Sequence, residues 1–218
     1  AAEGVRVVVN SARSVEAGTA LAASLPEATY VRADIADQAE AEALVAAAVE
    51  AYGRLDILVN NAGTTRLIPH GDLDAATPEV WREILAVNVV GTWQTSVAAL
   101  PHLREGGAGC IVNVSSIAAS RPAGSSIPYA VSKAAIEHMT RLLARVVGPD
   151  VRVNAVAPGL IETPWTRDFT AVADRLRAEA PLRRVGQPED VADAVLGLVA
   201  ATYVTGSVLL ADGGASLL

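Results

Sequence analysis

The sequence predicts an α/β fold in which a doubly wound parallel sheet is covered by helices on both faces. Segments with strand character and segments with helix character alternate along the whole chain, which is typical of a sheet built from strand–helix–strand units. The strand segments are continuously apolar, as expected for strands that are buried on both faces. With 218 residues, 51% of them hydrophobic and 19% charged, the chain can build the core of a single domain spanning residues 1–218.

The first half of the chain contains three predicted strands and two predicted helices. Three short apolar runs are the strands: residues 5–9, 29–33 and 55–59. Two segments are the helices: residues 14–25 and 37–52. The first helix is Ala-rich and ends before Pro26, and the second begins at the acidic Asp37 and ends before Gly53. A polar cap at the start and a glycine just past the end are the signals that delimit a helix.

The second half repeats the alternation. The predicted strands are residues 110–114, 151–157 and 207–211, and the predicted helices are residues 77–100, 128–147 and 188–200. Thr77 followed by Pro78 predicts a helix start, because Thr caps the free amides and Pro fits the first position. Pro101 is predicted to mark the last turn of that helix, and Gly148 with Pro149 closes the next one.

Charge and composition exclude several classes of function. The net charge is −7 and the pI about 5.0, whereas non-specific nucleic-acid binding needs clustered Lys and Arg. The one adjacent basic pair, Arg183 and Arg184, is predicted to lie in a solvated loop. The three histidines are far apart in sequence, so no metal site is predicted.

We expect a soluble protein of the cytoplasm. The chain has one cysteine, Cys110, so it forms no internal disulfide, which fits a reducing compartment. No stretch approaches the roughly 18 apolar residues of a membrane span. The first four residues have neither the basic start nor the apolar run of a signal peptide.

Tyr129 and Lys133 are the residues most suggestive of chemistry. They lie four apart in a predicted helix and therefore share a face. A nearby ammonium favours the phenolate and should lower the pKa of the tyrosine, which could then exchange a proton with a carbonyl or alcohol oxygen. Ser116 ends a predicted strand and could hydrogen-bond the same oxygen. Lys133 is also the only lysine among 17 Lys and Arg residues, although a four-residue spacing alone often arises by chance.

A series of ordered motifs surrounds this pair. They are Asn60-Asn61-Ala62-Gly63, Asn88-Val89-Val90-Gly91, Asn113-Val114-Ser115-Ser116, Tyr129-Ala130-Val131-Ser132-Lys133, Arg152-Val153-Asn154-Ala155-Val156-Ala157-Pro158-Gly159, Gly186-Gln187-Pro188-Glu189-Asp190, Tyr203-Val204-Thr205-Gly206 and Asp212-Gly213-Gly214. In order and spacing, across nearly the whole chain, the sequence resembles the short-chain dehydrogenase/reductase family, whose sheet is Rossmann-like. It is most similar to 3-oxoacyl-carrier-protein reductases and related sugar or secondary-alcohol dehydrogenases.

The resemblance implies a catalytic set of four residues: Asn88, Ser116, Tyr129 and Lys133. Tyr129 would be the acid/base, and Lys133 would lower its pKa and hold the nicotinamide ribose. Ser116, rather than Ser115, would bind the substrate oxygen because it has the family spacing to Tyr129. Asn88 would hold a water in a proton relay to Lys133.

The resemblance also implies a cofactor site, a lid and an assembly. Asp34 would contact the adenine, and the nicotinamide cofactor would further be lined by Asn61, Ala62, Gly63, Pro158, Gly159, Ile161 and Thr163. Residues 165–181 would form the mobile substrate lid, with an ordinary surface helix as the alternative. The family assembly implied is a homotetramer, built through the helices containing Asn88 and Tyr129 and through the last strand.

The end of the first predicted strand indicates the form of the cofactor. An acid there binds the free ribose hydroxyls of NAD, and a basic residue accommodates the extra phosphate of NADP. Ser11 stands where NAD-preferring relatives carry Asp, and Arg13 and Ser14 suit a phosphate. The sequence therefore predicts NADP(H).

One family segment is not found in the sequence. Relatives begin with a strand and a glycine-rich turn whose amides bind the pyrophosphate, whereas here residues 1–4 look like the tail of the helix that follows such a turn. Three explanations stay open: residues present in the protein but outside this sequence, a truncated chain with an altered sheet, or another chain or element in the vacant position.

Two classes of function follow. The first is an NADP(H)-dependent oxidoreductase that transfers hydride between nicotinamide and a carbonyl or secondary alcohol, with a small-molecule substrate that is either free or linked to acyl-carrier protein. The alternative is a cofactor-free scaffold or binding member of the family, which would have lost the dinucleotide site with the first strand.

Overall fold

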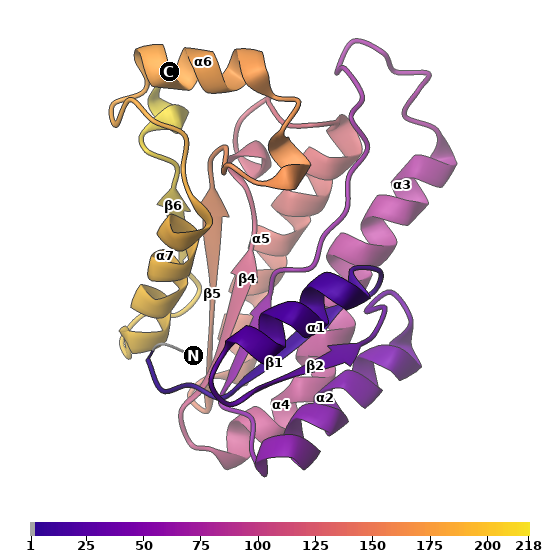
Figure 1. Ribbon diagram of the computed structural model, residues 1–218, viewed down its shortest axis with the longest axis vertical. Helices are drawn as coiled ribbons and strands as arrows, with labels where there is room; N and C mark the ends of the chain where they lie inside the picture. The colour runs from indigo at the N-terminus through magenta and orange to yellow at the C-terminus, as the bar shows by residue number, and fades with distance from the viewer. Residues whose placement is uncertain (1–2) are drawn as a thin grey trace.

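The computed structural model describes residues 3–218 and has the predicted alternation of strands and helices (Figure 1). The six strands are β1 (Val7–Ser11), β2 (Ala28–Arg32), β3 (Ile57–Asn60), β4 (Gly109–Val114), β5 (Val151–Pro158) and β6 (Val208–Ala211). The α-helices are α1 (Val15–Ser24), α2 (Gln38–Tyr52), α3 (Pro78–Leu85), α4 (Thr92–Glu105), α5 (Ile127–Val147), α6 (Thr170–Glu179) and α7 (Pro188–Ala200). Residues 1 and 2, part of the expected helix tail, lie outside the described residues, and Glu3 and Gly4 form a turn.

The helix ends follow local chemistry. The Asp37 carboxylate accepts a hydrogen bond from the Glu40 amide at the start of α2, and Gly53 ends that helix with a φ of 73°, a conformation that glycine adopts without strain. Pro78 stands in the first turn of α3, as predicted. The prediction for Pro101 was wrong, because α4 continues past it to Glu105.

All strand pairs are parallel, but they form two sheets. β1 pairs with β2, and a separate sheet has the order β3-β4-β5-β6. The division falls between β1 and β3, which no strand of residues 3–218 joins. Val59 of β3 is 42% exposed, so this edge of the four-stranded sheet is open to solvent. Burying its backbone amides and carbonyls without hydrogen-bond partners would be costly.

The four-stranded sheet is buried on both faces. Ile111 and Val153 pack with Leu103 of α4 and Leu143 of α5 on one side. Cys110, Val112 and Val156 point to the other side and pack against α7. Because neighbouring side chains on a strand point to opposite faces, two separate cores form on these strands, which explains their continuously apolar sequence.

α3 and α4 are joined by a π-helical turn, Ala86–Gly91, into one long helix. This helix, Pro78–Glu105, has 28 residues and a window with mean hydropathy 1.2, of which 39% is buried. It is therefore long and apolar enough to cross a membrane, contrary to the sequence expectation, but core helices of globular folds pass the same test. Here it packs on β3 and β4 and against α2.

A buried polar network lies beneath the carboxyl ends of β3 and β4. The Asn60 amide donates to Asn113 Oδ1 at 2.9 Å and to Ser96 Oγ at 3.0 Å, and the Asn113 amide donates to Thr140 Oγ1 at 2.9 Å. Asn113 is fully buried. The network ties two strands to α4 and α5 just below the predicted site.

We expect Asn113→Ala to lower the free energy of unfolding by about 2–4 kcal/mol, because it removes two buried hydrogen bonds and leaves a cavity. Urea denaturation measures this change. Asn61→Ala, the same substitution at an exposed position, is the matched control and should stay within about 0.5 kcal/mol of the wild type. Equal effects of the two substitutions would contradict a structural role for the network.

Candidate active site

Tyr129 and Lys133 lie in the first two turns of α5. The helix begins at Ser126, whose hydroxyl accepts a hydrogen bond from the Tyr129 amide at 3.3 Å. Lys133 is 3% exposed, and its Nζ donates to the Val114 carbonyl at 2.8 Å. Nζ lies 5.6 Å from the centre of the Tyr129 ring. The four-residue spacing therefore places an amine directly beside the phenol.

The end of β4 brings Ser116 to the same place. Ser116 has an extended backbone, and its hydroxyl accepts from the Ala118 amide at 3.2 Å and hydrogen-bonds with the Tyr129 side chain. Ser115 points elsewhere, donating to the Lys133 carbonyl at 3.2 Å and to Glu137 Oε1 at 3.3 Å. Of the two adjacent serines, Ser116 is the one that faces Tyr129.

Burial controls the ionisation of both groups. It raises the pKa of Tyr129 above its usual value, and the hydrogen bond from Ser116 offsets only part of this effect. It also lowers the pKa of Lys133 to about 8. The expectation that the ammonium lowers the tyrosine pKa is therefore wrong for this structure, because desolvation of the phenolate is the larger effect. Tyr129 stays protonated at neutral pH and can act as an acid.

Asn88 lies in the π-helical turn and is fully buried. Its side chain exchanges hydrogen bonds with the backbone of Thr64, at 2.7 and 3.0 Å, and donates to Ser132 Oγ at 2.9 Å. The Asn88 backbone carbonyl accepts a hydrogen bond from the Thr92 hydroxyl at 2.8 Å. Asn88 thus fixes the segment after β3 against the helix that carries Tyr129.

The residues predicted for the nicotinamide end lie around this group. Asn61, Ala62 and Gly63 are exposed after β3, and a Cβ at Gly63 would stand 3.6 Å from Lys133 Nζ. Pro158 ends β5, and Gly159 follows it in such close contact with Asp212 that a Cβ would stand 3.0 Å from the Asp212 backbone. Two more predicted residues lie just beyond: Ile161 pairs with Gly186, and Thr163 caps a short turn.

The residues predicted for the adenosine end lie apart from these, after β1 and β2. The Ser11 hydroxyl lies 2.9 Å from the Tyr30 hydroxyl, while Arg13 and Ser14 are exposed. Asp34 is engaged locally, since its carboxylate accepts from the Ala36 amide at 3.0 Å. Sequence reasoning missed Arg32, which ends β2 and donates to the Ala12 carbonyl at 3.3 Å.

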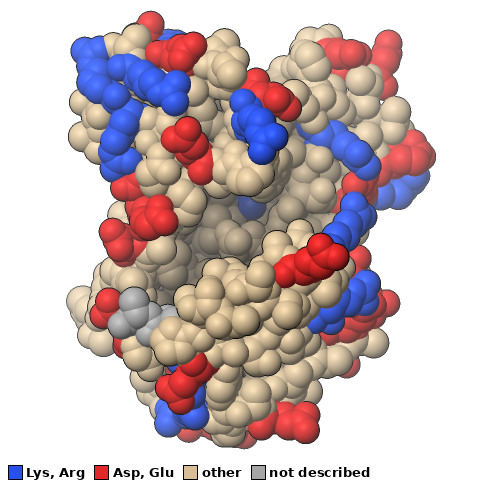
Figure 2. Space-filling model, in the orientation of Figure 1, with Lys and Arg blue, Asp and Glu red and all other residues tan. Residues whose placement is uncertain are grey.

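The surface is hollowed between the residues predicted for the nicotinamide end and those predicted for the adenosine end. Figure 2 shows the depression at the centre of this view, below the rim formed by α6 and above the segment containing α1 and β1. No glycine-rich turn joins a strand to a helix within residues 3–218. The residues predicted for the two ends of a dinucleotide site are therefore present among the described residues, whereas a segment for its pyrophosphate portion is not.

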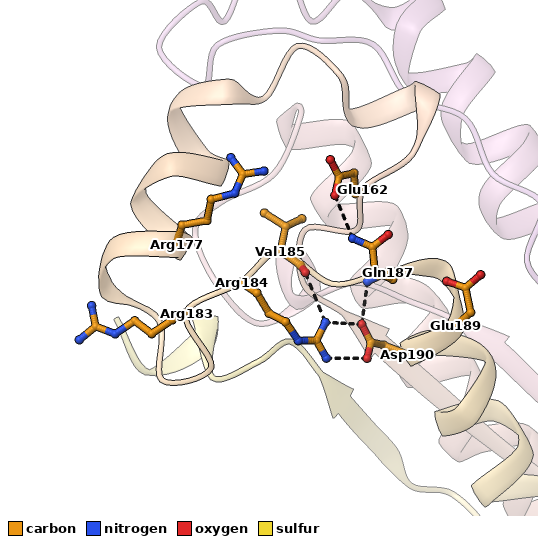
Figure 3. Close-up of a pocket in the computed structure, with 8 residues that line it drawn as sticks. All are labelled: Glu162, Arg177, Arg183, Arg184, Val185, Gln187, Glu189 and Asp190. Atoms are coloured by element: carbon orange, nitrogen blue, oxygen red, sulfur yellow. Dashed lines mark hydrogen bonds and ion pairs between the residues drawn. The ribbon is translucent and has the colours of Figure 1, made fainter.

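The lid region contains a separate polar cavity. A space of about 580 Å³ lies between α6 and the start of α7, where Arg184 pairs with Asp190 (Figure 3). This pair lowers the pKa of Asp190. Arg183 and Arg184 are exposed in a loop, as the sequence predicted, and Arg184 is engaged in this ion pair. Tyr129 and Lys133 do not line this cavity.

Two further side chains, one beside Tyr129 and one beside Ser115, were not singled out by the sequence. The Trp165 ring meets the Tyr129 ring edge to face, with centroids 6.2 Å apart. Glu137, one turn after Lys133, is nearly buried and bonds to Ser115 and Arg141. Both depend on the approach of segments distant in sequence.

A doubly wound parallel sheet with a serine, a tyrosine and a buried lysine gathered at its carboxyl edge defines an oxidoreductase that uses a nicotinamide dinucleotide. Comparisons with known proteins agree. The family model described as enoyl-(acyl carrier protein) reductase matches residues 1–216. The chain belongs to the short-chain dehydrogenase/reductase family.

This chain covers most of the length of its individual relatives. A putative ketoacyl reductase 2 of the granaticin polyketide synthase from Streptomyces violaceoruber is 70% identical, covering 100% of this chain and 89% of the relative. The 3-oxoacyl-acyl-carrier-protein reductase FabG of Thermotoga maritima is 38% identical, covering 83% and 74%.

Solved structures have the same fold. A putative short-chain dehydrogenase/reductase from Burkholderia xenovorans superposes with a TM-score of 0.92 at 33% identity, covering 99% of this chain and 90% of that one. A gluconate 5-dehydrogenase from Burkholderia cenocepacia, in complex with NADP and tartrate, gives 0.89 at 30% identity, covering 100% and 88%.

Proposed function

We propose that this oxidoreductase uses NADPH to reduce a carbonyl carried on an acyl thioester, in the manner of a 3-oxoacyl reductase. The convergence of Ser116, Tyr129 and Lys133 carries the proposal. The names of two relatives, a ketoacyl reductase and a 3-oxoacyl-acyl-carrier-protein reductase, support the substrate class.

The residues of the site have distinct roles in this proposal. When bound, the cofactor supplies the hydride. The Tyr129 hydroxyl donates the proton to the carbonyl oxygen, and the Ser116 hydroxyl steadies that oxygen through a hydrogen bond. Lys133 holds the ribose. Asn88 fixes Thr64 and Ser132 through its side-chain hydrogen bonds and holds a relay water.

Reduction of the N-acetylcysteamine thioester of acetoacetate tests the proposal, with NADPH consumption followed by absorbance. We expect turnover and a 3-hydroxyacyl product. The cofactor-free scaffold alternative predicts that even NADPH fluorescence does not change when protein is added. No turnover together with no binding would favour the scaffold over the enzyme.

The preference for NADP(H) rests on charge at the end of β1. In our proposal, Arg13 and Ser14 contact the 2′-phosphate and Arg32 lies close by, while Ser11 contacts the ribose. Among residues 3–218, Arg13 has no carboxylate partner, whereas Arg32 pairs with Glu40 at 2.8 Å. An unpaired guanidinium beside an exposed strand end suits a phosphate group.

We expect Arg13→Ala to weaken NADPH binding about ten- to a hundredfold, since a charge-assisted hydrogen bond contributes about 1.5–3 kcal/mol and about 1.4 kcal/mol is a factor of ten. Fluorescence titration gives the dissociation constants. Binding of NADH, which lacks the phosphate, serves as the internal control and should change less than about twofold. Tighter binding of NADH than of NADPH by the wild type would contradict the preference.

The lid offers a surface for an acidic carrier protein. Arginines gather over α6 at the upper left of Figure 2, and the chain around α6, up to the start of α7, contains Arg167, Arg175, Arg177, Arg183 and Arg184. Three of them pair with carboxylates, Arg175 with Glu179, Arg177 with Asp174 and Arg184 with Asp190, so the attraction of an acidic partner is proposed to rest on Arg167 and Arg183. We propose neither a nucleic-acid nor a membrane partner.

A cytoplasmic location fits Cys110, a buried thiol whose pKa is raised by burial.

The protein is further proposed to form a homotetramer. α4 and its preceding turn expose Val90, Trp93 and Val97, while α5 exposes Val131, Leu142 and Val146. These apolar rows also explain why the helix Pro78–Glu105 is hydrophobic enough to resemble a membrane span. Paired with a second copy, they would be removed from water.

Light scattering coupled to size exclusion should give about four times the chain mass of 22.4 kDa. Val146→Glu, which places a charge in the exposed row of α5, should shift the mass toward smaller species. Leu196→Glu, a half-exposed residue on α7, is the matched control and should leave the mass unchanged. A monomer in the wild type would contradict the proposed assembly.

A further inference from the structure

The short turn before α6 holds Trp165 in a fixed position. The Thr166 hydroxyl donates to the Ile161 carbonyl and accepts from the Thr163 amide at 3.1 Å. Thr163 and Thr166 cap this 3-10 turn reciprocally, and Pro164 restricts its first residue. The backbone bearing the indole is therefore set by local hydrogen bonds rather than by packing of the indole itself.

The indole stands beside the reactive tyrosine yet is half exposed. Its centroid lies 6.2 Å from that of Tyr129, with the rings at 84°, and 52% of its surface is exposed. The other flanks of the tyrosine ring are occupied: Lys133 Nζ lies 5.6 Å from the ring centre, and the backbone at Gly124 approaches it from another side. Trp165 is thus the apolar surface next to Tyr129 that water still covers.

A substrate must place its carbonyl oxygen at the Tyr129 and Ser116 hydroxyls. The Trp165 indole is then within reach of a group attached to the carbonyl carbon, because the two aromatic centroids are only 6.2 Å apart. An indole in an edge-to-face pair keeps most of its π-surface free, and a flat unsaturated group stacks on such a surface better than a saturated ring of similar size.

We propose that Trp165 is a specificity-determining residue that selects carbonyls attached to a flat, unsaturated ring. The inference rests on the proposed reductase function and specifies its substrate class. Trp165 acts by direct contact with the substituent, while Tyr129 and Ser116 handle the oxygen.

Two ketones of matched shape test the proposal: acetophenone, with a flat ring, and cyclohexyl methyl ketone, its saturated counterpart. The measured quantity is the ratio of their kcat/KM values with NADPH in the wild type, Trp165→Phe and Trp165→Ala. We expect the ratio to favour acetophenone in the wild type and to fall about five- to tenfold in Trp165→Ala, the range that an aromatic pair supports. Trp165→Phe, which keeps an aromatic face, should stay within about threefold of the wild type.

A general loss of folded enzyme lowers both kcat/KM values equally and therefore cancels in their ratio. Circular dichroism checks that both variants fold. An equal ratio in all three proteins would overturn the role of Trp165. So would a wild type that reduces the acetoacetyl thioester but neither ketone, and in that case the proposed function would stand. A wild type that reduces none of the three compounds would contradict the proposed function as well.

Discussion

Tyr129→Phe should reduce turnover of the acetoacetyl thioester by about a thousandfold, within the range attributed to loss of a positioned acid. The substitution removes the hydroxyl that donates the proton and keeps the ring that Trp165 and Lys133 contact. Burial keeps the tyrosine pKa above its usual value, so this hydroxyl is protonated at neutral pH and can donate to the expected carbonyl oxygen. Steady-state kcat at saturating NADPH measures the effect.

Tyr203→Phe is the matched control, because the Tyr203 side chain is fully exposed and should be dispensable. NADPH binding to Tyr129→Phe should stay within about threefold of the wild type, which separates a catalytic loss from a cofactor-binding loss. If Tyr129→Phe retained more than about a tenth of wild-type turnover, the assignment of the acid would be wrong.

Lys133→Met should abolish turnover and remove a pH dependence of stability. Burial lowers the pKa of Lys133 from 10.5 to about 8. Below the pKa of the folded state, the Lys133 amine is charged in both the folded and the unfolded chain. Folding then carries the full cost of desolvating the ammonium. Between the two pKa values only the unfolded chain binds the proton, so wild-type stability rises with pH. Relative to Lys133→Met, this rise should amount to about 2–3 kcal/mol between about pH 7.5 and about pH 10.

Urea denaturation of the wild type and Lys133→Met at the two pH values measures the difference between their free energies of unfolding. The contributions of other titrating groups cancel in this difference. Arg145→Met, at an exposed cation on the same helix, is the control, since a guanidinium does not titrate in this range and its pH dependence should match the wild type. Parallel pH profiles for the wild type and Lys133→Met would show that burial does not depress the amine pKa.

Much of the fold could be predicted because local patterns determined it. The continuously apolar runs of β4 and β5 correctly indicated strands with a core on each face, and Asp37 and Gly53 correctly delimited α2. Pro101 misled because a proline removes one helical hydrogen bond but does not end a helix held on β3 and β4. Within residues 3–218 the strands form two sheets, β1-β2 and β3-β4-β5-β6, with the parallel pairing that the alternation predicts.

The site was predictable only as far as spacing reaches. The i, i+4 relation correctly placed Tyr129 beside Lys133, and the strand end placed Ser116 against them. The direction of the Tyr129 pKa was not predictable, because the depth of burial depends on how β4, α5 and the turn containing Trp165 pack around the ring. The contacts of Trp165 with Tyr129 and of Arg32 with Ala12 were not predicted for the same reason, since each joins segments far apart in the sequence.

The central claim is that hydride passes from NADPH to a substrate carbonyl carbon beside Tyr129. Reduction of the acetoacetyl thioester with NADPH carrying deuterium at the transferable position of nicotinamide C4 tests it directly, with the product analysed by mass spectrometry and NMR. We predict one deuterium on the new carbinol carbon of the wild-type product and no product above background with Tyr129→Phe. A hydroxy product without deuterium at that carbon, or equal labelled product from both proteins, would contradict the account.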